Sequence, residues 1–244
     1  MESVLSIDFD YFQDITDPET FSSYPDGIDL PTEISSLVWA SKYATKRDKE
    51  KIMSVNILQN ELDILKEILL SQNSETKIMV RNSHLDIYYW IHKLISTDQK
   101  FSLRNIDMHH DFFNGNRFVD CGNWVEHIFD DYGRNNVNFK WISNPVSFDM
   151  YGFKQDELND LCVSTSLKDI RSEKYDYVFM CRSDNWFPPH LDEHFWDIIK
   201  IMESHFMNVD IYIEKRDGYK GIVEEISSLT KPLMDIMDRN MRKN

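Results

Sequence analysis

Glycine is scarce in this chain, with seven residues among 244. None of them falls in the G-x-G-x-x-G or G-x-x-x-x-G-K order that lets a backbone loop surround phosphate groups. Cysteine is also rare: Cys121, Cys162 and Cys181 are odd in number and form no C-x-x-C pair. The sequence therefore supports neither nucleotide binding by those loops, nor a disulfide framework, nor a thiolate zinc site. A reducing, cytoplasmic location is the expectation.

Basic residues and long apolar runs are limited as well. The chain has 27 Lys and Arg against 42 Asp and Glu, a formal net charge of −15. This balance argues against nucleic-acid binding, which needs a basic surface. It suits a cationic partner or substrate, although an acidic surface that only keeps the protein soluble is the simpler interpretation. No apolar run approaches the roughly 18 residues of a membrane span, and Met1–Val4 lacks the basic start of a signal peptide.

Short apolar runs alternate along the chain with segments of helical periodicity. This alternation predicts an α/β fold, namely a three-layer α/β/α arrangement around a mainly parallel sheet. No linker interrupts it, so we expect a single domain over 1–244. The segments expected to be strands are 4–10, 77–80, 102–107, 137–142, 175–180 and 209–213. Helices are expected over 32–43, 58–70, 87–95, 124–129 and 195–206.

The segment 106–111, Ile-Asp-Met-His-His-Asp, is the most informative one. If a strand ends near Asp107, then Asp107, His109 and Asp111 can converge beyond its carboxyl end, where open α/β sheets place their sites. Two carboxylates and an imidazole form a hard ligand set suited to Mn²⁺ or a similar divalent ion. An acidic turn with a chance histidine pair is the alternative.

Two further apolar runs end in candidate ligands. Asp8 and Asp10 follow the first run, and two carboxylates at a buried strand end repel each other unless a cation compensates them. A solvated strand end is the alternative for this pair. His84 follows the run 77–80, where a neutral imidazole is a common metal ligand, although a lone histidine there is more often a packing or capping residue.

Together these motifs resemble the arginase/deacetylase superfamily, and most closely the arginase-related family that includes peptide arginases. In arginases a histidine precedes D-x-H-x-D by about one strand-helix-strand step, as His84 precedes Asp107 here. The run 4–10 resembles the superfamily's D-x-D strand, and Gly122-Asn123-Trp124 resembles the short motif that follows D-x-H-x-D. Arginases carry D-x-D late in the chain, whereas it comes first here, so the resemblance implies a permuted strand order.

The resemblance implies a binuclear site in which six residues hold two Mn²⁺ or other divalent ions: Asp8, Asp10, His84, Asp107, His109 and Asp111. The implied reaction is hydrolysis of the guanidinium group of arginine, in a ribosomally made precursor peptide, to ornithine and urea. Asp184 is the expected catalytic and substrate-binding carboxylate, with metal ligation as the fallback, and Glu214 is a weaker candidate for guanidinium binding. His127 is a candidate proton shuttle or a structural residue.

Other functions stay open at this point. A deacetylase-type amide hydrolase would use one zinc ion and fewer carboxylates. A noncatalytic, metal-stabilised scaffold or peptide-binding protein would keep the ligands without turnover. The sequence does not distinguish peptidyl arginine from free arginine or agmatine, nor does it give the oligomeric state.

Overall fold

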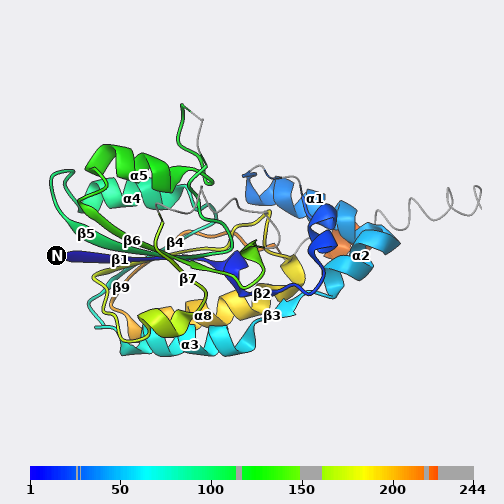
Figure 1. Ribbon diagram of the computed structural model, residues 1–244. Coiled ribbons are helices and arrows are strands. Elements are labelled where there is room, and N and C mark those ends of the chain that lie inside the picture. The colour runs from blue at the N-terminus through cyan, green and yellow to red at the C-terminus, as the bar shows by residue number, and fades with distance from the viewer. Residues whose placement is uncertain (26, 28, 114–116, 149–160, 217–219, 225–244) are drawn as a thin grey trace, which may run out of the picture.

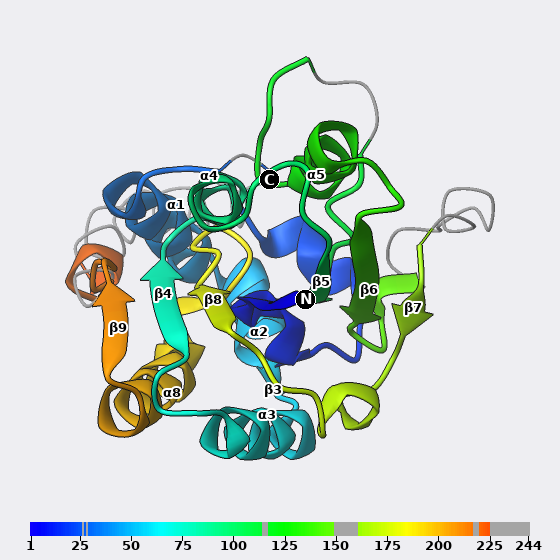
Figure 2. The ribbon, with the colours of Figure 1, turned by 90° about the vertical axis from the view of Figure 1, so that its left-hand side faces the viewer.

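A seven-stranded sheet whose strands all run parallel lies at the centre of the computed structural model (Figures 1 and 2). The structure describes residues 1–25, 27, 29–113, 117–148, 161–216 and 220–224. The strand order is β7-β6-β5-β1-β8-β4-β9. The strands are β1 (Glu2–Asp8), β4 (Lys77–Arg81), β5 (Phe101–Asp107), β6 (Val137–Ser143), β7 (Val163–Ser164), β8 (Tyr177–Cys181) and β9 (Asn208–Ile211).

Helices cover both faces of this sheet, which confirms the predicted three-layer α/β/α fold. Figure 2 shows α4 (Asp86–Leu94) and α5 (Trp124–Tyr132) on one face, and α3 (Gln59–Ser71) and α8 (Asp192–His205) on the other. Side chains alternate between the two faces along each strand. In β1, for example, Leu5 and Ile7 belong to the core under α3 and α8, whereas Val4 belongs to the core under α4 and α5.

Two further helices, α1 (Thr32–Ala44) and α2 (Lys46–Met53), lie beyond the carboxyl end of the sheet (Figure 1). The sequence did not predict α2, because this helix is mostly charged and buries a single residue, Ile52. A small antiparallel pair joins β2 (Gln13–Asp14) to β3 (Asn56–Ile57). Short 3₁₀ helices span Phe9–Phe12, Pro18–Ser23, Leu167–Ile170 and Pro189–Leu191.

The position of β1 matters most for the site. β1 lies directly between β5 and β8, with Ile7 beside Ile106 and Asp8 beside Cys181. The D-x-D and D-x-H-x-D segments therefore meet at one edge of the sheet although they are far apart in the chain. That this order is a permuted arginase sheet stays a prediction.

Two other expectations concern membrane spans and the C-terminal tail. In the part of the chain that the structure describes, no helix is both long enough and apolar enough to cross a membrane. The lysine- and arginine-containing tail after Lys231 lies outside the described residues.

Candidate metal centre

Carboxylates and imidazoles gather where β5, β1 and β4 end. Asp107 closes β5, Asp8 closes β1, and Asp10 follows in the 3₁₀ turn that Asp8 caps by accepting a hydrogen bond from the Asp10 N–H at 3.2 Å. His84 comes three residues after β4 ends, and its side chain lies close to Asp8 and Asp107. Asp8, Asp10, Asp107 and Asp111 are each at most 3% exposed. Four buried carboxylates this close together call for compensating positive charge.

A first group, the His84 cluster, consists of His84, Asp107, Asp111 and Asp8. The Nδ1 atom of His84 lies 2.9 Å from Oδ2 of Asp111 and 3.2 Å from Oδ2 of Asp107. The same Nδ1 atom lies 3.3 Å from Oδ2 of Asp8. Three carboxylates thus converge on one imidazole nitrogen, and all four side chains are almost completely buried.

A second group, the His109 cluster, consists of His109, Asp10 and Asp107. The Nδ1 atom of His109 lies 3.1 Å from Oδ2 of Asp10 and 3.6 Å from Oδ1 of Asp107. Asp107 belongs to both clusters, and its two oxygens face different histidines. Asp107 could therefore offer one oxygen to each cluster.

The spacing and the lack of hydrogen bonds both fit metal ions. Two ligand atoms at right angles, each about 2.1 Å from one ion, lie about 3 Å apart, which matches the distances within both clusters. The Nδ1 atom of His84 and the Oδ2 atom of Asp10 are fully buried and have no hydrogen-bond partner among the described residues. The donor set of carboxylates and imidazoles suits Mn²⁺ and similar ions. These residues could therefore hold a metal ion.

Neighbouring side chains orient the candidate ligands. Nε2 of His84 lies 2.7 Å from the Ser6 hydroxyl, so a proton on Nε2 would leave the Nδ1 lone pair facing the carboxylates. The indole N–H of Trp124 donates to Oδ2 of Asp111 at 2.6 Å. The Ser183 hydroxyl donates a short hydrogen bond to Oδ2 of Asp8.

Trp124 belongs to the Gly122-Asn123-Trp124 segment, so that segment contributes to the centre by orienting Asp111. Asp111 and Ser183 both have a left-handed φ of 52°, a conformation that concentrates at functional sites. His110, the other histidine of the pair, points elsewhere: its Nδ1 accepts the Phe112 backbone N–H at 2.9 Å, and its ring lies against Trp141.

The proton affinities of the ligands show how strongly the groups interact. Burial alone would lower the pKa of His84, but the charge of Asp111 and the close contacts with the Asp107 and Asp111 carboxylates raise it well above its usual value. Burial alone would raise the pKa of Asp107, but its close contacts with the imidazoles of His109 and His84 hold it far below its usual range. Burial, followed by the charge of Asp8, raises the pKa of Asp10 to about 7. Protons shared within the clusters thus supply positive charge that a divalent cation could replace.

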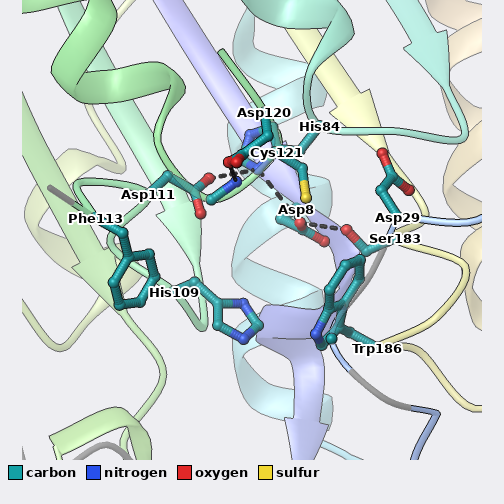
Figure 3. A pocket seen from close by; sticks show the side chains of 12 residues that line it. Asp8, Asp29, His84, His109, Asp111, Phe113, Asp120, Cys121, Ser183 and Trp186 are labelled. Carbon is teal, nitrogen blue, oxygen red and sulfur yellow. Dashed lines mark hydrogen bonds and ion pairs between the residues drawn. The ribbon is translucent and has the colours of Figure 1, made fainter. Parts of the chain in front are cut away.

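A cavity of about 590 Å³ opens onto this centre (Figure 3). Its lining includes metal-ligand candidates from both clusters, and two carboxylates that the sequence did not single out, Asp29 and Asp120. The other lining residues are Gly27, Phe113, Cys121, Gly122, Ser183 and Trp186. No lysine or arginine is found among the described residues that line it. The cavity is therefore an acidic pocket with aromatic side chains at Phe113 and Trp186.

Asp184 and Glu214, the carboxylates expected to bind the substrate, lie outside the described lining of this cavity. Asp184 is buried and paired with Arg182, whose Nε lies 2.6 Å from Oδ1, and the Thr32 hydroxyl donates to its Oδ2 at 2.6 Å. It is not among the described residues lining the cavity. The guanidinium next to Asp184 is thus one that the protein itself supplies.

Glu214 and His127 also lie outside that lining. Glu214 follows β9, and its backbone carbonyl accepts a hydrogen bond from Arg182 at 2.7 Å. The ring of His127, on α5, lies 6.2 Å from that of Tyr88 in an edge-on contact. Neither side chain is among the described residues that face the candidate metal centre.

Sequence reasoning missed several residues of the site. Asp29 lies in a turn-rich stretch without periodicity, and Asp120 and Phe113 lie in the loop after D-x-H-x-D, so no spacing pattern marks them. Cys181 ends β8 close enough to Asp8 and His84 to form a further potential ligand group. Burial raises the pKa of the Cys181 thiol well above its usual value. Only the position of Cys181 at a strand end could have indicated its proximity.

Comparison with known proteins adds no identification. No protein-family model matches the chain, and no curated protein or solved structure shows significant similarity to it. The resemblance to arginases therefore stays a prediction, and it rests on the ligand motifs and on how the fold brings them together.

Proposed function

We propose that this chain binds two divalent ions, manganese by the hardness of the donor set, and hydrolyses the guanidinium group of an arginine residue within a peptide. One observation carries the proposal: Asp107 is shared by two clusters of histidine and carboxylate, and both clusters contribute residues to the lining of an acidic pocket. The His84 cluster would hold one ion and the His109 cluster the other. Asp8, beside His84 and hydrogen-bonded to the Asp10 N–H, would be a further ligand.

Divalent ions held by these residues would lower the pKa of a nearby water toward neutrality and would stabilise negative charge that develops during the reaction. The protein contributes rigid positioning. Ser6, Trp124 and Ser183 orient three ligands from outside the clusters, and near-complete burial keeps bulk solvent away from them. The acidic pocket attracts a cationic group to the same place. In the overall reaction the guanidinium and one water give urea and the side-chain ammonium of ornithine.

The pocket also favours peptidyl arginine over the free amino acid. Free arginine carries an α-carboxylate, which would need a cationic or strongly donating partner in an otherwise acidic pocket. The described lining contains no lysine or arginine to meet it. Exposed aromatic side chains, Phe113 at 44% and Phe118 at 79%, come from the loop beside the pocket and offer apolar surface to flanking peptide residues.

The test is urea release by the manganese-loaded protein from three compounds: an acetylated, amidated arginine peptide, free arginine and agmatine. Mass spectrometry of the peptide identifies ornithine. We expect urea and ornithine from the peptide and little urea from free arginine. Absence of urea from all three, with both ions bound, would contradict the proposal. Release of acetate from an acetyl-lysine peptide instead would indicate the deacetylase-type reaction.

A further inference from the structure

Asp29 is one of the two carboxylates that line the pocket outside the metal clusters. Asp29 lines the cavity on the side of Ser183 and Trp186 (Figure 3). The Ser83 hydroxyl donates a short hydrogen bond to its Oδ2, which fixes the orientation of the side chain. Its other oxygen, Oδ1, has no hydrogen-bond partner in the part of the chain that the structure describes. Asp29 is thus a held carboxylate with one oxygen available to the pocket.

The charges around Asp29 are unusual for a largely buried acid. Two other carboxylates nearby are paired with arginine: Arg182 pairs with Asp184, and Arg216 pairs with Asp192. The charges that act on Asp29 come from Asp184, Asp8 and other acids, and burial raises its pKa to about 6. Among the described ion pairs, none joins Asp29 to a lysine or an arginine. A partly buried carboxylate without a cation is costly unless a ligand brings one.

The walls of the pocket indicate which cation fits. Phe113 and Trp186 line the same cavity and approach it from different segments of the chain (Figure 3). Aromatic faces attract cations, and they stack best on the flat, weakly hydrated guanidinium group. A pocket that combines a carboxylate oxygen with aromatic side chains therefore suits a guanidinium better than a compact, strongly hydrated ammonium.

We propose that Asp29, positioned by Ser83, is the specificity-determining residue that receives the substrate's guanidinium above the metal centre. This inference rests on the proposed function and replaces Asp184 in the substrate-binding role. Ser83 directly precedes His84 in the chain. The same short loop therefore positions Asp29, through Ser83, and carries the candidate metal ligand His84. The segment Ser83-His84 thus links recognition of the guanidinium group to the placement of its carbon near the two clusters.

The experiment compares two probes of nearly equal shape, acetyl-arginine amide, which is cationic, and acetyl-citrulline amide, which is neutral. Binding to the manganese-loaded protein is followed by stopped-flow tryptophan fluorescence at times too short for turnover. The variants are Asp29→Asn, which removes the charge, and Asp29→Glu, which keeps it. Asp86→Asn is the matched control, since Asp86 is a neighbouring acid that the cavity lining does not include.

We expect Asp29→Asn to weaken binding of acetyl-arginine amide on the order of 10- to 100-fold, the effect of losing a hydrogen bond to a charged group. Binding of acetyl-citrulline amide and the metal content should stay as in the wild type, and Asp29→Glu should keep a preference for the cation. Asp86→Asn should behave as the wild type does.

Equal affinities of the wild type and Asp29→Asn for acetyl-arginine amide would overturn the role of Asp29, whether or not urea is released. Lack of any preference for the cationic probe in the wild type would overturn it too. An Asp29-dependent preference without urea release from any substrate would instead support the role of Asp29 and contradict the hydrolytic function.

Discussion

Replacing Trp124 with phenylalanine tests how far the surroundings of the ligands set metal affinity. Trp124 is fully buried, its indole N–H donates to Oδ2 of Asp111 at 2.6 Å, and its ring lies 5.0 Å from that of His84. Phenylalanine keeps most of the apolar packing but cannot donate a hydrogen bond. The variant therefore removes one orienting hydrogen bond from Asp111 and leaves every ligand in place.

The size of the effect follows from the hydrogen bond that the variant removes. A hydrogen bond to a charged group contributes about 1.5–3 kcal/mol, and loss of an orienting partner of a ligand typically costs about 10- to 100-fold in metal affinity. We expect weaker manganese binding in that range, and lower stability because the smaller ring leaves a cavity. The assay is titration of the metal-free protein with Mn²⁺ by calorimetry, with the free energy of unfolding measured in parallel.

Trp39→Phe provides the control. Trp39 is also fully buried, and its indole N–H donates to the backbone carbonyl of Asp184 at 2.7 Å, outside both clusters. This variant should lose stability for the same reasons but keep the wild-type affinity for manganese. Equal manganese affinities in Trp124→Phe and Trp39→Phe would refute the role assigned to Trp124.

Three further predictions concern pH, a buried ion pair and the backbone. Burial raises the pKa of Asp29 to about 6, and only the ionised form attracts a cation. The affinity for acetyl-arginine amide, measured by stopped-flow binding, should therefore rise with pH through about 6 and then level off. The Asp29→Asn variant should lack that rise. Arg182→Met leaves the buried carboxylate of Asp184 without its partner and should lower the free energy of unfolding by about 3–5 kcal/mol in denaturant titrations; removing the exposed Arg171 that pairs with Glu67 should cost at most about 1 kcal/mol. Gly133 has a φ of 80°, and a Cβ at this position would meet no atom within 4 Å, so backbone strain is the expected cost of a side chain there. Gly133→Ala should cost about 1–2 kcal/mol and lower the Tm by roughly 2–8 °C in calorimetry. An unchanged Tm would contradict this expectation.

The sequence sufficed to predict the layers of the fold. Apolar runs and helical periodicity located six of the sheet strands and the four helices on its faces, because burial on one or both sides leaves a regular pattern in the residues. It did not predict which strands are neighbours. The position of β1 between β5 and β8 depends on how whole layers pack, and no local pattern records that.

The clustering of the candidate ligands was predictable from the sequence, whereas the surroundings of Asp184 and the position of Asp29 were not. Asp8, His84 and Asp107 each follow an apolar run, so their positions at one edge follow from the parallel sheet. Asp184 also follows such a run, but its partner Arg182 folds back onto it, a contact between side chains that periodicity cannot reveal. Asp29 lies in an irregular stretch, where residue spacing does not indicate which way a side chain points.

The decisive measurement is the number of manganese ions bound per chain, determined by elemental mass spectrometry on the wild type and on Asp10→Asn, Asp111→Asn and Asp107→Asn. One ligand group consists of Asp10, Asp107 and His109, the other of His84, Asp107 and Asp111, so Asp107 is the residue that they share. We therefore expect two ions in the wild type, about one in each of the first two variants and none in Asp107→Asn. His109→Ala should resemble Asp10→Asn and should also abolish urea release. Two ions retained in Asp107→Asn, or a single ion in the wild type after manganese supplementation, would contradict a binuclear centre built around Asp107.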